Sequence, residues 1–377
     1  MHLEKKLLKN LNLTIPVLVI ALTILGLIAV STAVSGITEN PAEYLRTQLV
    51  AAFLGIILVV LIQFYDYRVF REYDVILYLI TISILSALLV AGATAGGGTR
   101  WLTLGPVTFQ PSEIAKILLI LFFASWMDRN EEELSSFKGF IKHLGYLLPP
   151  FFLVVLQNDL GTALVLVFIF LTMFYIAGGR VKDIVLTFGG GFIAVVVMIS
   201  SHIYFSTPLI FLQPYQLNRL IGFIKPEIDP RGIGYNIIQV RIAIGSGQLT
   251  GRGFRQGPQN QLNFLPEQHT DFIFAVIGEE FGFIGAALII ILFVLLLLQI
   301  IKVALKAKDN FGKLITAGII AMFFFHFIEN VGMSLGIMPI TGIPLPFISY
   351  GGSSMVTSMV AIGLILNINI RRKKINF

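Results

Sequence analysis

Long apolar stretches alternate with short polar connections along the 377 residues of the chain. A helix needs roughly 20 apolar residues to cross about 30 Å of hydrocarbon, and most of these stretches approach that length. The pattern predicts an all-α integral membrane protein with ten transmembrane helices, over 13–33, 46–65, 73–92, 111–127, 143–157, 160–178, 183–205, 271–301, 314–336 and 352–370. A long polar connection, residues 206–270, separates the seventh span from the eighth.

Composition supports this class. Hydrophobic residues make up 56% of the chain and charged residues only 13%, whereas soluble domains carry about 25% charged residues. The sequence contains no cysteine, which excludes disulfides and thiolate chemistry. We therefore expect one membrane domain over residues 1–377, with 206–270 as an extracytoplasmic loop within it.

The basic residues predict an orientation. Eighteen of the 27 Lys and Arg residues fall in one set of connections and the terminal segments, whereas the short connections of the opposite side hold only Arg46 and Arg100. Short cytoplasmic loops are enriched in Lys and Arg, so both termini are predicted to be cytoplasmic. The formal charge of +6 is thus a topology signal, and we expect no nucleic-acid partner.

The unusual stretches all fall on the predicted outer face, over 98–113, 156–162, 206–270 and 338–354. No nucleotide-binding fingerprint is present, so an enzyme acting there must draw its energy from the substrate itself.

The composition of the long loop predicts a surface helix and a site for an anionic group. Residues 233–245 form an apolar stretch with one charge, which indicates a helix at the membrane surface. Basic residues beside the glycines of 245–254 suit an anionic group, and ordinary solvated loop charge is the alternative. A lipid with an anionic head would fit both features. The loop holds Arg219, Lys225, Arg231, Arg241, Arg252 and Arg255 against Glu227, Asp229 and Glu267.

Five motifs, in order across nearly the whole chain, resemble the SEDS family of peptidoglycan polymerases. PEQHTD and IAIGSG resemble its rod-shape branch more than its division or sporulation branches. The motifs are GTRWLTLGPVTFQPSEIAK (98–116), QNDLGTA (157–163), YNIIQVRIAIGSGQLTGRGF (235–254), LPEQHTDFIFAVIGEEFG (265–282) and PLPFISYGGSS (344–354).

The resemblance implies a glycosyltransferase of the bacterial cytoplasmic membrane. It would polymerise lipid II into β-1,4 glycan strands on the outer face during cell elongation, with the growing strand and membrane lipid as further ligands. A class B penicillin-binding transpeptidase is the implied protein partner, and a divalent cation, Mg²⁺ or Mn²⁺, is left open. A flippase of the same lipid and a scaffold without catalytic activity are the alternative functions.

Asp271 matches the catalytic aspartate of the family, which implies a general base. The alternative is a structural role, with Thr270 as the N-cap and Asp271 in the first turn of the eighth span. We expect His269 to be a hydrogen-bonding neighbour of the site. Glu279 and Glu280 are two turns deeper and are expected to pair with His326 or Asn330.

Glu113 and Lys116 are three residues apart and share a helical face. They form either a self-neutralising ion pair or, as the resemblance implies, part of a cavity in which Lys116 meets a pyrophosphate. Arg46, Arg100 and Arg219 are the further cations expected at the outer mouth. Asp159 either caps the sixth span or binds substrate or a cation.

Overall fold

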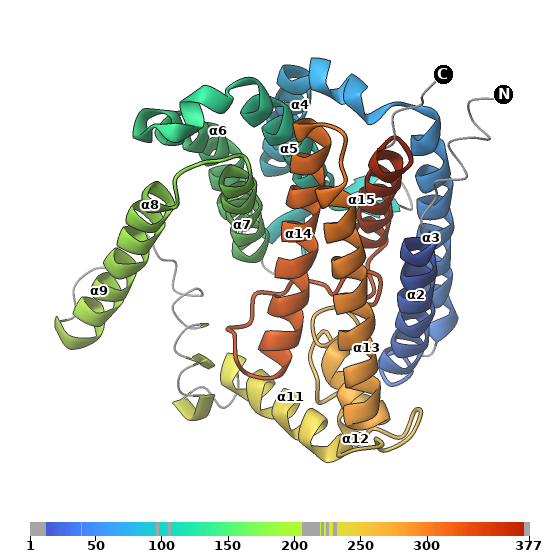
Figure 1. Ribbon diagram of the computed structural model, residues 1–377. Coiled ribbons are helices and arrows are strands. Elements are labelled where there is room, and N and C mark those ends of the chain that lie inside the picture. The colour runs from blue at the N-terminus through green and yellow to red at the C-terminus, as the bar shows by residue number, and fades with distance from the viewer. Residues whose placement is uncertain are drawn as a thin grey trace.

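The computed structural model describes residues 13–38, 40–95, 98–104, 107–205, 219, 222–223, 226–228 and 232–372, and most of these are helical (Figure 1). The longer helices are α2 (Thr14–Ala33), α3 (Pro41–Phe64), α4 (Asp74–Ala91), α5 (Pro111–Arg129), α6 (Phe137–Leu156), α7 (Leu160–Ile176), α9 (Gly190–Phe205), α11 (Ile233–Gly247), α13 (Ile273–Leu305), α14 (Asn310–Ser334) and α15 (Gly352–Ile370). Short helical turns are η1 (Tyr67–Glu72), η2 (Glu131–Ser135), α8 (Val181–Ile184), the π-turn η3 (Val185–Gly189), η4 (Pro226–Ile228) and α12 (Pro258–Gln261).

Each of the ten predicted spans overlaps a described helix, so the helical class is confirmed. Within the described part of the chain, six helices are long and apolar enough to cross a membrane, namely α2, α3, α6, α13, α14 and α15. Two shorter apolar helices coincide with α4 and α7. That all ten segments cross a membrane, and that 206–270 is one outer loop, stay predictions.

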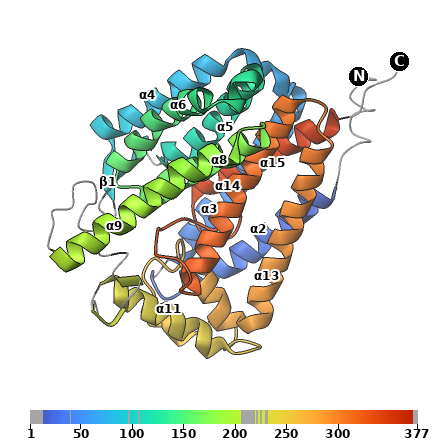
Figure 2. The ribbon, with the colours of Figure 1, turned by 60° about the vertical axis from the view of Figure 1, so that its left-hand side comes forward.

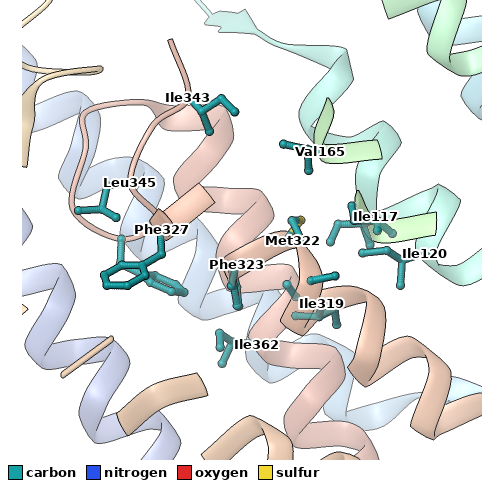
Figure 3. Close-up of a cluster of buried hydrophobic side chains, with 14 of the residues drawn as sticks. Ile117, Ile120, Val165, Ile319, Met322, Phe323, Phe327, Ile343, Leu345 and Ile362 are labelled. Atoms are coloured by element: carbon teal, nitrogen blue, oxygen red, sulfur yellow. The ribbon is translucent and has the colours of Figure 1, made fainter. Parts of the chain in front are cut away.

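Helix α14 lies at the centre of the bundle and packs against α5, α7 and α13, while α15 packs against α3. Small residues let these helices approach closely: a Cβ on Gly318 of α14 would lie within 3.0 Å of Ile120 and Met173. Figure 3 shows the apolar cluster around α14, to which the loop after α14 contributes side chains that include Ile343 and Leu345. That loop is therefore part of the core.

The bundle has two chemically different ends. Asn367, near the end of α15, binds the carbonyls of Ile62 and Tyr65 beside η1, and we call this the η1 end. Helices α11 and α12 lie at the opposite end, at the bottom of Figure 1, which we call the α11 end.

Helix α13 is broken near its start. Gly282 has φ 64° and ψ −161° inside it, a backbone conformation that essentially only glycine adopts. The freed N–H groups of Phe283 and Ile284 donate instead to the carbonyls of Gln248 (2.8 Å) and Leu249 (3.1 Å), just after α11. The break thus docks the first turns of α13 against α11.

Two features lie outside what the sequence pattern predicted. A small antiparallel sheet, in the order β1 (Ala93–Ala95), β2 (Gly98–Leu104), β3 (Val107–Phe109), fills the connection between α4 and α5. The seventh predicted span is divided by the π-turn η3 into α8 and α9. Figure 2 shows α8 and α9 as one long rod. Apolar side chains of this rod, such as Ile193 and Val197, are exposed.

Candidate active site

Asp271 lies in a tight turn just before α13. Glu267 has a positive φ of 42°, and its carbonyl accepts the N–H groups of Thr270 (3.1 Å) and Asp271 (3.0 Å). The helix begins at Ile273, and its N-terminal residue Phe272 makes no side-chain cap. The expected N-cap is therefore wrong: the Thr270 hydroxyl donates to the Glu267 carbonyl (3.3 Å), because the turn has already engaged it.

The surroundings of Asp271 tune its acidity. Burial raises the pKa of its carboxyl from 3.8 to about 6, and the negative charge of Glu267 adds to the rise, while the neighbouring Thr270 side chain and the charges of Arg219 and Arg100 oppose it. A carboxyl with this pKa is mostly ionised at neutral pH and close to the acidity at which proton transfer is efficient. Gly342 lies against it: a Cβ there would be 3.0 Å from Asp271 Oδ2.

Two of the three predicted cations lie near Asp271. Arg219 donates to the carbonyl of Thr341 (3.3 Å), next to Gly342, and Arg100 donates to the carbonyl of Asn158. Arg46 is exposed on α3 and takes no part in these contacts. Lys225, Asp229 and Arg231 lie outside the described residues.

Glu113 and Lys116 form the predicted ion pair, with 2.8 Å between Lys116 Nζ and Glu113 Oε1. Their side chains are 4% and 1% exposed, so the pair is buried. His326 of α14 completes it, because its Nε2 lies 3.0 Å from Lys116 Nζ. A lysine that donates to His326 requires the neutral, accepting form of that ring nitrogen.

Helix α14 connects this buried pair to Asp271. Asn330 follows His326 by four residues, which is about 6 Å along a helix and on the same face. The side-chain amide of Asn330 donates to the backbone carbonyl of Asp271 (2.9 Å). Lys116 and Asp271 are therefore bound to one face of α14, one turn apart.

Asp159 is an N-cap, as one of its two predicted roles required. Its carboxylate accepts the N–H of Thr162 (3.1 Å) at the start of α7 and the Thr162 hydroxyl (2.9 Å). Gln110, at the start of α5, contacts the same carboxylate at 3.4 Å. The capping role is confirmed, and a role in binding substrate or a cation stays a prediction.

His269 packs against two tyrosines. Its ring centroid is 5.5 Å from that of Tyr44 and 5.5 Å from that of Tyr350. Burial lowers the pKa of His269, and the charge of Glu267 only partly offsets this. The ring is therefore a neutral wall beside the Asp271 turn.

The partners expected for Glu279 and Glu280 are wrong. Glu279 accepts the backbone N–H groups of Gln259 (2.8 Å) and Asn260 (3.1 Å), and Glu280 accepts the N–H of Arg255 (3.0 Å) and the Asn260 side chain (2.8 Å). The break at Gly282 turns this part of α13 toward the segment after α11 instead of toward α14. Their carboxylates hold that segment in place.

Two observations bear on other sites. Among the described residues no three His, Asp or Glu side chains group as metal ligands, so the divalent cation stays a prediction and no step of the mechanism depends on it.

A cavity of about 190 Å³ is lined by residues of α5, α7 and α14, including Asp128 and Lys313. It lies at the η1 end, because Lys313 precedes Asn330 on α14 by 17 residues, or about 25 Å, so it is not the site around Asp271.

The chain was compared with known proteins. The family model of FtsW, RodA and SpoVE, described as "Cell cycle protein", matches residues 12–374. The chain belongs to this family. It is 37% identical to the peptidoglycan glycosyltransferase MrdB of Escherichia coli strain K12, covering 86% of this chain and 85% of that protein. It is 34% identical to the peptidoglycan glycosyltransferase RodA of Treponema pallidum, covering 94% of this chain and 96% of that one.

A solved structure shows the same fold. It is titled "Structural coordination of polymerization and crosslinking by a peptidoglycan synthase complex", and one of its chains superimposes with a TM-score of 0.80 at 29% identity. The match covers 96% of this chain and 98% of that chain. The likeness therefore extends over nearly the whole fold.

Proposed function

We propose that this chain is a peptidoglycan glycosyltransferase that polymerises lipid II, with Asp271 as its general base. The observation that carries the proposal is the Asp271 turn itself: a carboxyl with a pKa of about 6 that is acted on by the charges of Arg219 and Arg100, in a member of this family. The names of the relatives support the activity and the substrate.

The proposed reaction balances without an external energy source. The 4-hydroxyl of GlcNAc on the incoming lipid II attacks the anomeric carbon of the reducing-end MurNAc of the growing strand. A β-1,4 bond forms with inversion, the bond to undecaprenyl pyrophosphate breaks, and Asp271 accepts the hydroxyl proton. General bases of this kind contribute about 10²- to 10⁴-fold to rate.

The cations supply the electrostatic part of the mechanism. The leaving pyrophosphate gains negative charge as the bond breaks, and fixed positive groups stabilise that charge best in a site shielded from water. Arg219 and Arg100 lie close enough to Asp271 to lower its pKa, so they are the first candidates. Lys116 is the second, held by Glu113 and His326 on the same face of α14 that binds Asp271.

The orientation follows from the charge distribution. The η1 end carries Arg68, Arg71, Arg129 and Arg371 among its described residues, and the rule for basic loops places this end in the cytoplasm. The α11 end, with Asp271, then faces the outside of a bacterial cytoplasmic membrane, where lipid II is consumed. We assign ten crossings, with both termini inside.

The proposed partner is a class B penicillin-binding transpeptidase, because polymerisation and crosslinking are coordinated in the complex whose chain this fold matches. The match to RodA and MrdB relatives supports a role in cell elongation.

One experiment separates the candidate functions. The purified full-length protein is given lipid II in detergent, and products are resolved by length. Glycan strands support the polymerase. In a parallel assay with vesicles, movement of lipid II across the membrane without formation of glycan strands would support a flippase. Neither strands nor movement, with the partner present, would support a scaffold.

A further inference from the structure

The backbone carbonyls of three consecutive residues, ending with Asp271, are all held from one side. The donors belong to α14 and to the loop after it, which are far away in the sequence. In chain order the carbonyls of His269, Thr270 and Asp271 accept hydrogen bonds from the N–H of Tyr350 (2.9 Å), the hydroxyl of Ser349 (2.6 Å) and the side-chain amide of Asn330 (2.9 Å). We call these three donors the carbonyl clamp.

The clamp donors are themselves fixed. The amide nitrogen of Asn330 also donates to the carbonyl of Ile343 (2.8 Å), and Asn330 is completely buried. The Ser349 oxygen accepts the N–H of Leu345 (2.8 Å), so the same two side chains close the loop after α14. A buried amide between two backbone carbonyls makes hydrogen bonds that are costly to lose.

The loop that carries Ser349 is anchored in the core. Phe347 has a positive φ of 68°, a rare conformation for a bulky residue that persists only where the surroundings enforce it. Its side chain is 1% exposed and packs against Phe323 of α14. The clamp thus ties the Asp271 turn to the buried core of the bundle.

Nothing in α13 supplies this restraint on the carbonyl side of Asp271. The first helical N–H groups, those of Ala275 and Val276, donate to the carbonyl of Phe272, which leaves the carbonyls before it to other partners. Without the clamp, the Asp271 backbone would be held by its own N–H and the turn alone.

We propose that Asn330 and Ser349 are positioning residues that aim the Asp271 carboxylate at the acceptor hydroxyl. This inference rests on the proposed function, since it gives the clamp a role in catalysis through Asp271. A general base must lie within hydrogen-bond reach of its proton in the reacting complex, and a displacement of about 1 Å costs on the order of 10²-fold in rate.

The chain offers a matched control for the test. Asn367 of α15 is also completely buried, and its side-chain amide also donates to two backbone carbonyls, those of Ile62 and Tyr65, at the η1 end. Asn330→Leu and Asn367→Leu each remove one such amide and replace it with an apolar group of the same shape. Both variants are made in the full-length protein and assayed with lipid II, with the transpeptidase partner present throughout.

Both variants are expected to lose thermal stability, Asn367→Leu at least as much as Asn330→Leu because Asn367 also accepts the N–H of Tyr67 (3.2 Å), and they are expected to differ in kinetics. For Asn330→Leu, kcat should fall on the order of 10²-fold, with KM for lipid II within about twofold of wild type. The acid limb of its pH–rate profile should move to lower pH, because a loosened carboxyl is better solvated and its pKa returns toward the ordinary value. Asn367→Leu should keep the wild-type kcat and pH profile.

Equal kinetics in the two variants would overturn the proposal. If Asn330→Leu does not fold, Ser349→Ala decides instead, with a lower kcat expected and a wild-type kcat contradicting the clamp. Asp271→Asn, assayed beside them, tests the proposed function separately. An active Asp271→Asn would contradict the role of Asp271 as general base. An inactive Asp271→Asn together with a fully active Ser349→Ala would contradict only the role of the clamp.

Discussion

Exposed ion pairs at the η1 end contrast with the buried hydrogen-bond network around Asp271 at the α11 end. At the η1 end, charged side chains pair with one another at the surface, as in Lys142–Glu133 (2.8 Å), where both side chains are more than 40% exposed. At the α11 end, uncharged side chains such as Asn330, Ser349 and Gln48 are buried and bind backbone groups. Exposed pairs contribute little to stability, whereas buried networks depend on every partner. The exposed ion pairs of the η1 end therefore tolerate change, whereas the buried network around Asp271 fixes geometry.

The strongest test of this difference removes the base at the α11 end. Asp271→Asn keeps the size of the side chain but cannot accept a proton at neutral pH, so polymerisation of lipid II should fall by about 10²- to 10⁴-fold. Strand formation is measured together with lipid II binding, which should stay near wild type, and with thermal stability, which should not fall below that of wild type. Polymerisation within about threefold of wild type would remove Asp271 from the mechanism.

Lys116 should have a smaller catalytic effect, because several cations share the pyrophosphate charge. Lys116→Ala also leaves Glu113 buried and unpaired, which costs on the order of 3–5 kcal/mol of stability. The double change Lys116→Met with Glu113→Gln removes both charges and separates the two effects. Recovery of the melting temperature without recovery of turnover supports a role in binding the pyrophosphate, whereas recovery of both makes the pair purely structural.

The acidity of Asp271 predicts the pH dependence. With a pKa of about 6, the base is lost to protonation below that pH, and kcat/KM should fall about tenfold per pH unit there. Glu267, Arg219 and Arg100 are the charged groups that act on it. Glu267→Gln removes the negative neighbour, so the acid limb should move to lower pH. An unchanged limb would mean that another group controls it.

The same pKa has a consequence for stability, with a defined sign. A carboxyl whose folded pKa is raised favours folding in its protonated form, and this contribution is lost as pH rises from 3.8 to about 6. Asn mimics the protonated acid. The melting temperature of Asp271→Asn relative to wild type should therefore rise across this window, and a constant difference would contradict the raised pKa.

The smallest effect is expected at the η1 end. Glu133→Gln breaks the exposed pair with Lys142 and should change stability by less than about 1 kcal/mol. Strand formation should equal that of wild type at all pH values. A loss of polymerisation as large as that of Lys116→Ala would show that the two ends are not as different as their contacts indicate.

The sequence predicted the helical class well because apolar length is a property of each segment alone. It also predicted α11 and the cap by Asp159, since both depend on neighbours within a few residues. The three-stranded sheet before α5 was missed, because its strands are three to seven residues long and lie between glycines. The partners of Glu279 and Glu280 were predicted wrongly, because a search among side chains does not find backbone N–H groups.

In the candidate site, too, local features were predicted from the sequence and long-range contacts were not. Asp271 was identified by its motif, and the Glu113–Lys116 pair by helical spacing. The roles of Asn330 and Ser349 were missed, because they bind carbonyls 59 and 79 residues away. No local pattern marks such contacts. The single signal was the resemblance of 344–354, which identified the segment without saying what its side chains hold.

The long reach of the clamp gives the chain a built-in order of assembly. During synthesis the PEQHTD turn leaves the ribosome before α14 and the loop after it, and the clamp donors are the last part of the site to be made. A nascent chain that ends before Ser349 already contains Asp271 and every predicted cation, yet it lacks two of the three clamp donors, Ser349 and Tyr350. Polymerisation should therefore begin only when the final helix has entered the membrane, so a ribosome stalled earlier releases no active fragment.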